Sequence, residues 1–212
     1  MKHKRLDLAS EIKIASLPAN LYGFLYPTFE AISNSIHSIE DKFQEKAHEL
    51  GLIKVVFDID SKSISVEDNG EGFSKNNVDA FLTPFTGNKL KRNGKGFGRF
   101  ISFKIFERVF YASPTVFDDG ETRSATFEYL PLSADENLEE INDSRLIGRH
   151  KHDTGLTVIF CQPKEDYLRF FDFTSDKADE NYTEEAILIA ILDHFLLDFI
   201  QEKTPKNFIC EI

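Results

Sequence analysis

Apolar residues recur three, four or seven positions apart over residues 20–50, which is the spacing of a helix with one buried face. The members of this series are Leu21, Phe24, Leu25, Phe29, Ile32, Ile36, Ile39, Phe43 and Leu50. Pro27 lies within the pattern, and because proline lacks a backbone donor and clashes with the preceding turn, we expect it to start the main helix or to kink it. Gly51 is the predicted end of the helix.

Strand-like runs follow this helix. Residues 53–59 and 63–67 are rich in β-branched and other apolar side chains, and the three polar residues between them predict a hairpin. Later segments of the same character predict strands at residues 108–112, 125–130 and 156–161. Helices and strands therefore alternate in one chain, which is typical of the α/β and α+β classes.

Two shorter helices are predicted at residues 76–82 and 99–106, on either side of a loop over residues 83–98 that is rich in Gly, Lys and Asn. Such a loop is a candidate lid over a binding site. A final amphipathic helix is predicted at residues 183–202. Its apolar flank consists of Ala186, Ile189, Leu192, Leu196 and Ile200. The last apolar run, residues 208–212, predicts a strand, and because a strand needs a partner we expect the chain to be truncated there.

The pattern divides the chain into an N-terminal extension (residues 1–19), one domain (residues 20–182), and a C-terminal helix with the start of a following domain (residues 183–212). A length of 212 residues is enough for one domain with a sizeable core. No run of 18 apolar residues occurs, and the basic N-terminus lacks the apolar stretch of a signal peptide. We therefore expect a cytoplasmic protein without a membrane partner.

Charge and cysteine content narrow the partners. The net charge of −11 disfavours nonspecific binding to nucleic-acid phosphates by the chain as a whole, although a nucleic-acid partner stays open. Seven basic residues and a single acid lie between Lys89 and Arg108, and such a local positive field suits a polyphosphate. Cys161 and Cys210 lie far apart and form no C-x-x-C pair, so neither a disulfide nor a zinc site is expected.

Glu30 and Asn34 are four residues apart on the first predicted helix, so their side chains lie one turn apart on one face and can reach the same ligand. A carboxylate there can orient or deprotonate a water molecule for attack on a terminal phosphate, and an amide oxygen can bind Mg²⁺. We therefore predict Glu30 as the catalytic base and Asn34 as the metal ligand. For this segment alone, an ordinary polar surface face is an equally good interpretation.

Two glycine-containing segments follow. Residues 68–72 read Asp-Asn-Gly-Glu-Gly, and Gly70 and Gly72 suit a backbone with positive φ or one that closely approaches a ligand, although such turns are common in any protein. Residues 93–99 read Asn-Gly-Lys-Gly-Phe-Gly-Arg and lead into a helix, where backbone N–H groups and the helix dipole can bind phosphate. The phosphate-binding candidates in this loop are Gly94, Lys95, Gly96, Phe97, Gly98 and Arg99.

The order of the three motifs resembles the GHKL superfamily, which includes gyrase-type topoisomerases, Hsp90-type chaperones, MutL-type repair proteins and sensor histidine kinases. The resemblance covers residues 20–160, and residues 30–35, Glu-Ala-Ile-Ser-Asn-Ser, look most like the Hsp90-like form. It implies that residues 20–182 are a GHKL ATP-binding domain with the Bergerat fold. That fold is a two-layer α/β (α+β) sandwich with helices packed on one face of a mixed, mostly antiparallel sheet.

The resemblance also implies roles. Asp68 would read adenine, because its carboxylate can accept a hydrogen bond from the exocyclic amine, where guanine carries a carbonyl. The activity implied is Mg²⁺-dependent ATP binding and slow ATP hydrolysis, with a lid that couples the ATP or ADP state to conformational change or to homodimerisation. Members of the superfamily commonly borrow a lysine from a following domain or partner, and we expect such a contribution here. The client could belong to nucleic-acid processing, chaperoning or defence signalling.

Two positions depart from the family pattern. The relatives commonly place Asp where this chain has His37, so pocket detail and pH response should differ. The family's Gly-Thr pair, which opens a core strand, corresponds here to Gly155 and Leu156. Three outcomes are open: a bulge brings Thr157 into the pocket, Thr154 substitutes for it, or the contact is lost. Thr157 is the nucleotide-binding candidate at this position.

The sequence also bears on other ATP-binding classes. The glycine loop also resembles that of protein kinases, but no Val-Ala-Ile-Lys, His-Arg-Asp or Asp-Phe-Gly element follows, and no Walker A motif occurs. A histidine kinase catalytic domain would usually carry Asn in place of Glu30 and would follow a phospho-acceptor helix. A nucleotide-sensing interaction module that binds ATP with little hydrolysis is the alternative from a different class.

Overall fold

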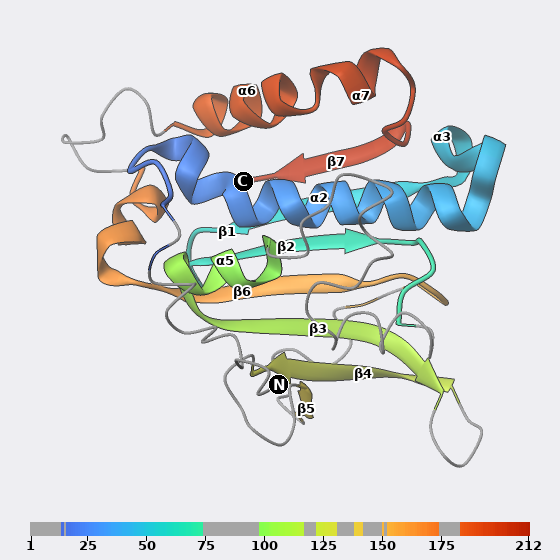
Figure 1. Ribbon diagram of the computed structural model, residues 1–212, viewed down its shortest axis with the longest axis horizontal. Helices are drawn as coiled ribbons and strands as arrows, with labels where there is room; N and C mark the ends of the chain where they lie inside the picture. Colours follow the sequence, from blue (N-terminus) through green and yellow to red (C-terminus); the bar gives the residue numbers. More distant parts are fainter. Residues whose placement is uncertain are drawn as a thin grey trace, which may run out of the picture.

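The structure is a computed structural model that describes residues 14, 16–73, 98–116, 122–130, 138–141, 150, 152–173 and 183–212. These residues form a seven-stranded sheet in the order β5-β4-β3-β6-β2-β1-β7 (Figure 1). The strands are β1 (Leu52–Asp58), β2 (Ser63–Asp68), β3 (Phe106–Val116), β4 (Thr122–Tyr129), β5 (Leu138–Glu140), β6 (Thr157–Pro163) and β7 (Asn207–Glu211). Neighbouring strands are antiparallel except β1 and β7, which are parallel. The predicted α+β class with a mixed, mostly antiparallel sheet is confirmed.

The long predicted helix is present, with a break near its end. It consists of α2 (Leu21–Phe43), the 3₁₀ turn η1 (Gln44–Lys46) and α3 (Ala47–Leu50). The side chain of Asn20 begins α2 by accepting a hydrogen bond from the Gly23 N–H at 3.1 Å. Pro27 lies inside α2 and does not start it. The chain leaves the helix at Gln44, whose φ of 51° is incompatible with a right-handed helix.

The predicted hairpin is also confirmed, and its register decides where the acidic turn lies. Strands β1 and β2 are antiparallel, with Ile53 opposite Asp68. Alternation along β2 places Asp68 on the same face as Val66, which is buried against the helix layer. Glu67 lies on the other face, opposite Thr157 of β6.

Helices α2 and α5 (Gly98–Ile105) pack against each other and against one face of the sheet (Figure 1). The core between these layers is aromatic. Phe24, Phe100 and Phe106 are each at most 1% exposed, and Phe24 stacks on Phe170 with ring centroids 4.4 Å apart. A 3₁₀ segment, η3 (Glu165–Phe171), supplies Phe170 and was not predicted. This layer fixes α2 over β1 and β2.

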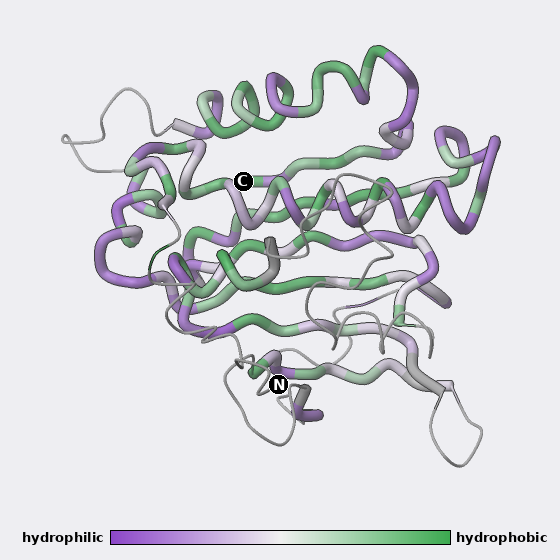
Figure 2. The backbone as a smooth tube through the Cα atoms, in the orientation of Figure 1, coloured by the Kyte–Doolittle hydropathy of each residue, from purple (hydrophilic) through white to green (hydrophobic). Residues whose placement is uncertain are grey.

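The C-terminal helix buries a different face from the predicted one. The predicted helix is divided into α6 (Glu184–His194) and α7 (Leu196–Ile200). Its buried residues are Ile187, Ala190, Ile191 and Phe195. The flank chosen from periodicity was wrong, since Leu192 is 52% and Ile200 68% exposed. The reason is that α6 carries apolar residues nearly all round (Figure 2), so spacing alone cannot select its buried side. The predicted last strand is β7, and its partner is β1.

Some expectations fall outside the described residues. The helix predicted at residues 76–82 lies there, as does nearly all of the loop over residues 83–98. Within the described part of the chain, no helix is both long and apolar enough to cross a membrane.

Candidate functional site

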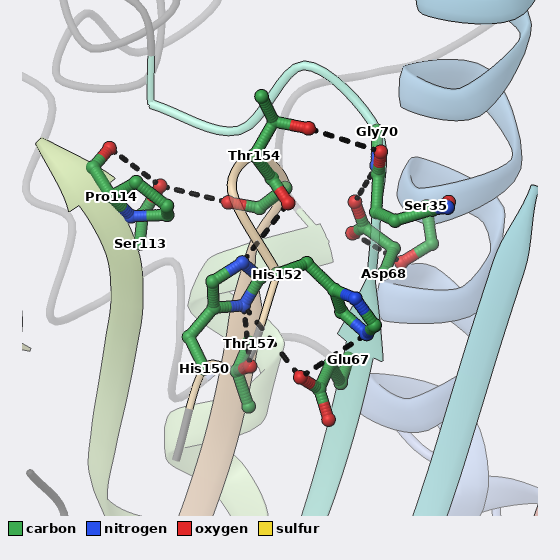
Figure 3. A network of polar contacts seen from close by, with 12 residues as sticks. Ser35, Glu67, Asp68, Gly70, Ser113, Pro114, His150, His152, Thr154 and Thr157 are labelled. Carbon is green, nitrogen blue, oxygen red and sulfur yellow. Dashed lines mark hydrogen bonds and ion pairs between the residues drawn. The ribbon is translucent and has the colours of Figure 1, made fainter. Parts of the chain in front are cut away.

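Asp68, the last residue of β2, lies beneath α2 with 3% of its surface exposed. The Ser35 hydroxyl of α2 donates to its Oδ2 at 2.9 Å, and the backbone N–H of Gly70 donates to its Oδ1 at 2.8 Å (Figure 3). A helix and a turn therefore hold the two carboxylate oxygens in fixed directions. Each oxygen can accept more than one hydrogen bond, so the group can still accept one from a ligand.

Burial raises the pKa of Asp68 to about 6, although hydrogen bonds from Gly70 and Ser35 lower it. The carboxylate is thus mostly ionised at neutral pH but close to its titration range. A carboxylate that is buried and oriented, yet retains acceptor capacity, is suited to recognising an amine donor.

Three glycines allow the turn after β2 to approach α2 and the loop before β6. A Cβ at Gly70 would lie 2.3 Å from the Oγ of Ser38. Gly72 has the predicted positive φ, at +69°. A Cβ there would lie 2.3 Å from the carbonyl oxygen of Gly155. Gly155 has a φ of +106°, and its Cβ would lie 2.1 Å from the carbonyl oxygen of Asp68. Side chains at these positions would separate the three segments.

The loop over residues 152–156 holds the turn from the side away from α2. The Asp68 N–H donates to the Leu156 carbonyl oxygen at 2.9 Å. The Ser113 hydroxyl, from β3, donates to the Gly155 carbonyl oxygen at 2.8 Å (Figure 3). The backbone around Asp68 is therefore connected to β3 as well as to β6.

Thr157 does not reach Asp68. It lies on the opposite face of the sheet, where its hydroxyl is 3.0 Å from Nδ1 of His150. The Nε2–H of His150 donates to the Thr154 carbonyl oxygen at 3.0 Å, since a carbonyl can only accept. The Thr154 hydroxyl donates to the carbonyl oxygen of Asn69 at 3.3 Å. Among the described residues, no threonine hydroxyl contacts the Asp68 carboxylate, because β6 enters the sheet without a bulge.

Glu30 and Asn34 are on α2, one turn apart as predicted. Glu30 is half-buried and Asn34 is exposed. The Tyr26 hydroxyl donates to Oε1 of Glu30 at 3.2 Å, across one further turn of the helix. Glu30 is five residues from Ser35, or ~7.5 Å along the helix axis. One helix thus supplies both a contact to Asp68 and the Glu/Asn pair. His37 is half-buried on the same helix.

The glycine loop is described only at its end. Helix α5 begins at Gly98, so the loop leads directly into a helix as predicted, and Arg99 lies in the first turn. The other phosphate-binding candidates lie outside the described residues. They are Gly94, Lys95, Gly96 and Phe97.

Sequence reasoning missed the side of α2 that contacts the turn. Ser35, Ser38 and Lys42 are spaced three and four residues apart and therefore share one face. Ser38 accepts a hydrogen bond from the Glu71 N–H at 2.9 Å, and Lys42 donates to the Asn69 carbonyl oxygen at 2.6 Å. Their polar side chains at helical spacing, on the same helix as Glu30 and Asn34, were the signal that could have identified them.

Neither the family models nor the curated proteins yield a match to this chain. Within the described part of the chain, no three His, Cys, Asp or Glu side chains gather to hold a metal ion. A single amide oxygen such as that of Asn34 still fits Mg²⁺, because this ion commonly takes one or two protein ligands and completes its shell with phosphates and waters.

Proposed function

We propose that this protein binds ATP with Mg²⁺ and hydrolyses it slowly, as the resemblance to the GHKL superfamily implies. The observation that carries the proposal is the buried carboxylate of Asp68, held by Ser35 and Gly70 beneath the helix that bears Glu30 and Asn34. Adenine would donate its exocyclic amine to Asp68, and the phosphates would extend toward the Glu/Asn pair. We also propose that the α+β structure is a Bergerat fold.

In the hydrolytic step Glu30 orients a water molecule and accepts its proton. The water oxygen forms a bond to the γ-phosphorus while the bond from that phosphorus to the β,γ-bridging oxygen breaks, which leaves ADP and phosphate. The Asn34 amide oxygen would hold Mg²⁺, which neutralises phosphate charge when bound. The loop over residues 83–98 would close over the phosphates through the N–H groups that precede α5. The lid, nucleotide-dependent homodimerisation and a lysine from a further domain or partner are parts of the same proposal.

One observation favours the alternative of a sensing module with little hydrolysis. The Asp68 end of the site is held by several buried contacts, whereas the Glu30 carboxylate accepts a hydrogen bond from Tyr26. A site of this kind could bind nucleotide well and turn it over poorly. The histidine kinase alternative is the weaker enzyme hypothesis, because such domains usually carry Asn where this chain has Glu30.

The test is calorimetric titration of the full chain with ATP and with a non-hydrolysable analogue in the presence of Mg²⁺, together with phosphate release. Asp68→Asn should abolish saturable binding, while Glu30→Ala should retain it and lower phosphate release by about a hundredfold or more. Binding without Glu30-dependent release would favour the sensing module. Absence of binding in the wild type would refute the nucleotide proposal.

A further inference from the structure

Lys42 connects three segments that surround Asp68. It lies in the last turn of α2, and its Nζ donates to the Asn69 carbonyl oxygen at 2.6 Å and to the Thr154 hydroxyl. The Thr154 hydroxyl in turn donates to the Asn69 carbonyl oxygen at 3.3 Å. One ammonium group thus joins the helix, the turn after β2 and the loop before β6.

The turn and the loop meet each other through glycines, although the neighbouring Phe73 and Leu156 pack against the core. Gly72 and Gly155 are in backbone contact, and both have positive φ. Glycine-containing backbone has a larger conformational freedom than any other, so its position depends on the polar groups that fix it. Asn69, which Lys42 holds, directly follows Asp68.

The Lys42 ammonium group has further neighbours besides Asn69 and Thr154. Burial lowers the pKa of Lys42, while the charges of Asp68 and Asp153 raise it. The Nζ also lies 4.4 Å from the centroid of the Phe43 ring, a cation–π distance. A lysine whose donors are directed at two protein oxygens restrains its neighbours more than a solvated one does.

We propose that Lys42 is a positioning residue for adenine recognition, which holds the turn so that the Asp68 carboxylate meets the base. The inference rests on the proposed ATP-binding function and extends it. Lys42 is twelve residues from Glu30, or ~18 Å along the helix axis. Its removal therefore weakens nucleotide binding and selectivity for the base but leaves the chemical step unchanged.

The experiment compares Lys42→Met with Lys42→Arg in the full chain. Titrations with ATP and with GTP in Mg²⁺ give the two dissociation constants, and phosphate release gives KM and kcat. Lys42→Met should weaken ATP binding roughly tenfold, the worth of a hydrogen bond from a charged donor, with kcat changed less than about twofold. The ratio of the GTP to the ATP dissociation constant should be smaller in Lys42→Met than in the wild type, because both nucleotides still bind through their phosphates. Lys42→Arg should recover much of the ATP affinity because it keeps the charge and the donors.

Lys203→Met is the matched control, because Lys203 is exposed on the segment between α7 and β7. It should bind ATP like the wild type. Equal losses for ATP and GTP in Lys42→Met, together with a lower melting temperature, would overturn the positioning role in favour of a structural one. Unchanged ATP affinity in Lys42→Met would also overturn it. If the wild type itself binds no ATP, the proposed function fails, which is a result distinct from failure of the Lys42 role alone.

Discussion

Helix α2 contributes candidate site residues at two places, around Asp68 and around Glu30, and these two ends of the candidate site differ in how they are built. At the Asp68 end, α2 and the turn after β2 donate to the carboxylate, the loop before β6 accepts from the Asp68 backbone N–H, and the residue is 3% exposed. At the other end, Glu30 is half-buried, Asn34 is exposed, and the contact to Glu30 comes from the same helix. The first end is formed by tertiary structure, and the second by helical spacing.

This difference has consequences for mutation. Where several segments converge, a substitution should alter both stability and nucleotide binding, because the fold and the site share the same contacts. Where one helix presents side chains outward, a substitution should alter the rate of the proposed ATP hydrolysis with little effect on stability.

Gly155→Ala should have the largest effect on stability. The added Cβ would meet the Asp68 carbonyl oxygen at 2.1 Å, and the φ of +106° is one that alanine rarely adopts. Backbone cannot move aside as a flexible side chain can, so we expect the free energy of unfolding to fall by about 2–5 kcal/mol. Urea denaturation measures it. Asn34→Ala, at the exposed end, should change it by less than about 0.5 kcal/mol. Comparable losses in both variants would remove the distinction.

Asp68→Asn should increase stability at neutral pH, although it should abolish the proposed binding of ATP. Because the pKa of Asp68 is raised from 3.8 to about 6, its contribution to stability is fully present below about pH 4 and is lost as the pH rises through about 6. The amide carries no charge to desolvate and can still accept from Gly70 while it donates to Ser35. The free energy of unfolding of Asp68→Asn should therefore exceed that of the wild type by up to about 3 kcal/mol at pH 7.

The measurement is the difference in the free energy of unfolding between Asp68→Asn and the wild type, followed from pH 4 to pH 8. The difference should rise with pH and level off above about pH 6, since both proteins share every other titrating group. A constant difference would show that the carboxylate is not destabilised by burial.

Local features of the sequence were sufficient for part of this site. The Glu30 and Asn34 positions follow from helical spacing, and the end of the second strand follows from the turn residues after Asp68. The face of Thr157 follows from strand alternation once Gly155 is placed, and the structure selects the outcome in which the threonine contact to Asp68 is absent.

Contacts that depend on sheet register could not be predicted in this way. Thr154 meets Asn69, which is 85 residues distant, only because β6 pairs with β2 in one particular register. Lys42 reaches both of them, although in the sequence it resembles any charged residue near a helix end. The buried side of α6 was assigned wrongly because a helix that is apolar nearly all round offers no periodic signal.

Ser35→Ala should have an intermediate effect on stability. It removes the donor to Oδ2 of Asp68, and a hydrogen bond to a charged group is worth about 2 kcal/mol. Because that hydrogen bond lowers the pKa of Asp68, its loss should raise this pKa further and extend to higher pH the window over which stability is lost. In an Asp68→Asn background the same substitution should cost less. Equal costs in the two backgrounds would mean that the serine does not act through the carboxylate.

Tyr26→Phe should have the smallest effect, and it distinguishes the two proposed functions. The Tyr26 hydroxyl donates to Oε1 of Glu30 at 3.2 Å, so its removal frees the carboxylate to rotate. If Glu30 orients the attacking water, kcat for phosphate release should fall roughly threefold while ATP affinity is unchanged, because one hydrogen bond that positions the base is lost. If the tyrosine instead withholds Glu30 from water, as a sensing module would require, phosphate release should increase. Steady-state phosphate release at saturating ATP, with Tyr22→Phe as the control for loss of an exposed hydroxyl on the same helix, separates the two outcomes.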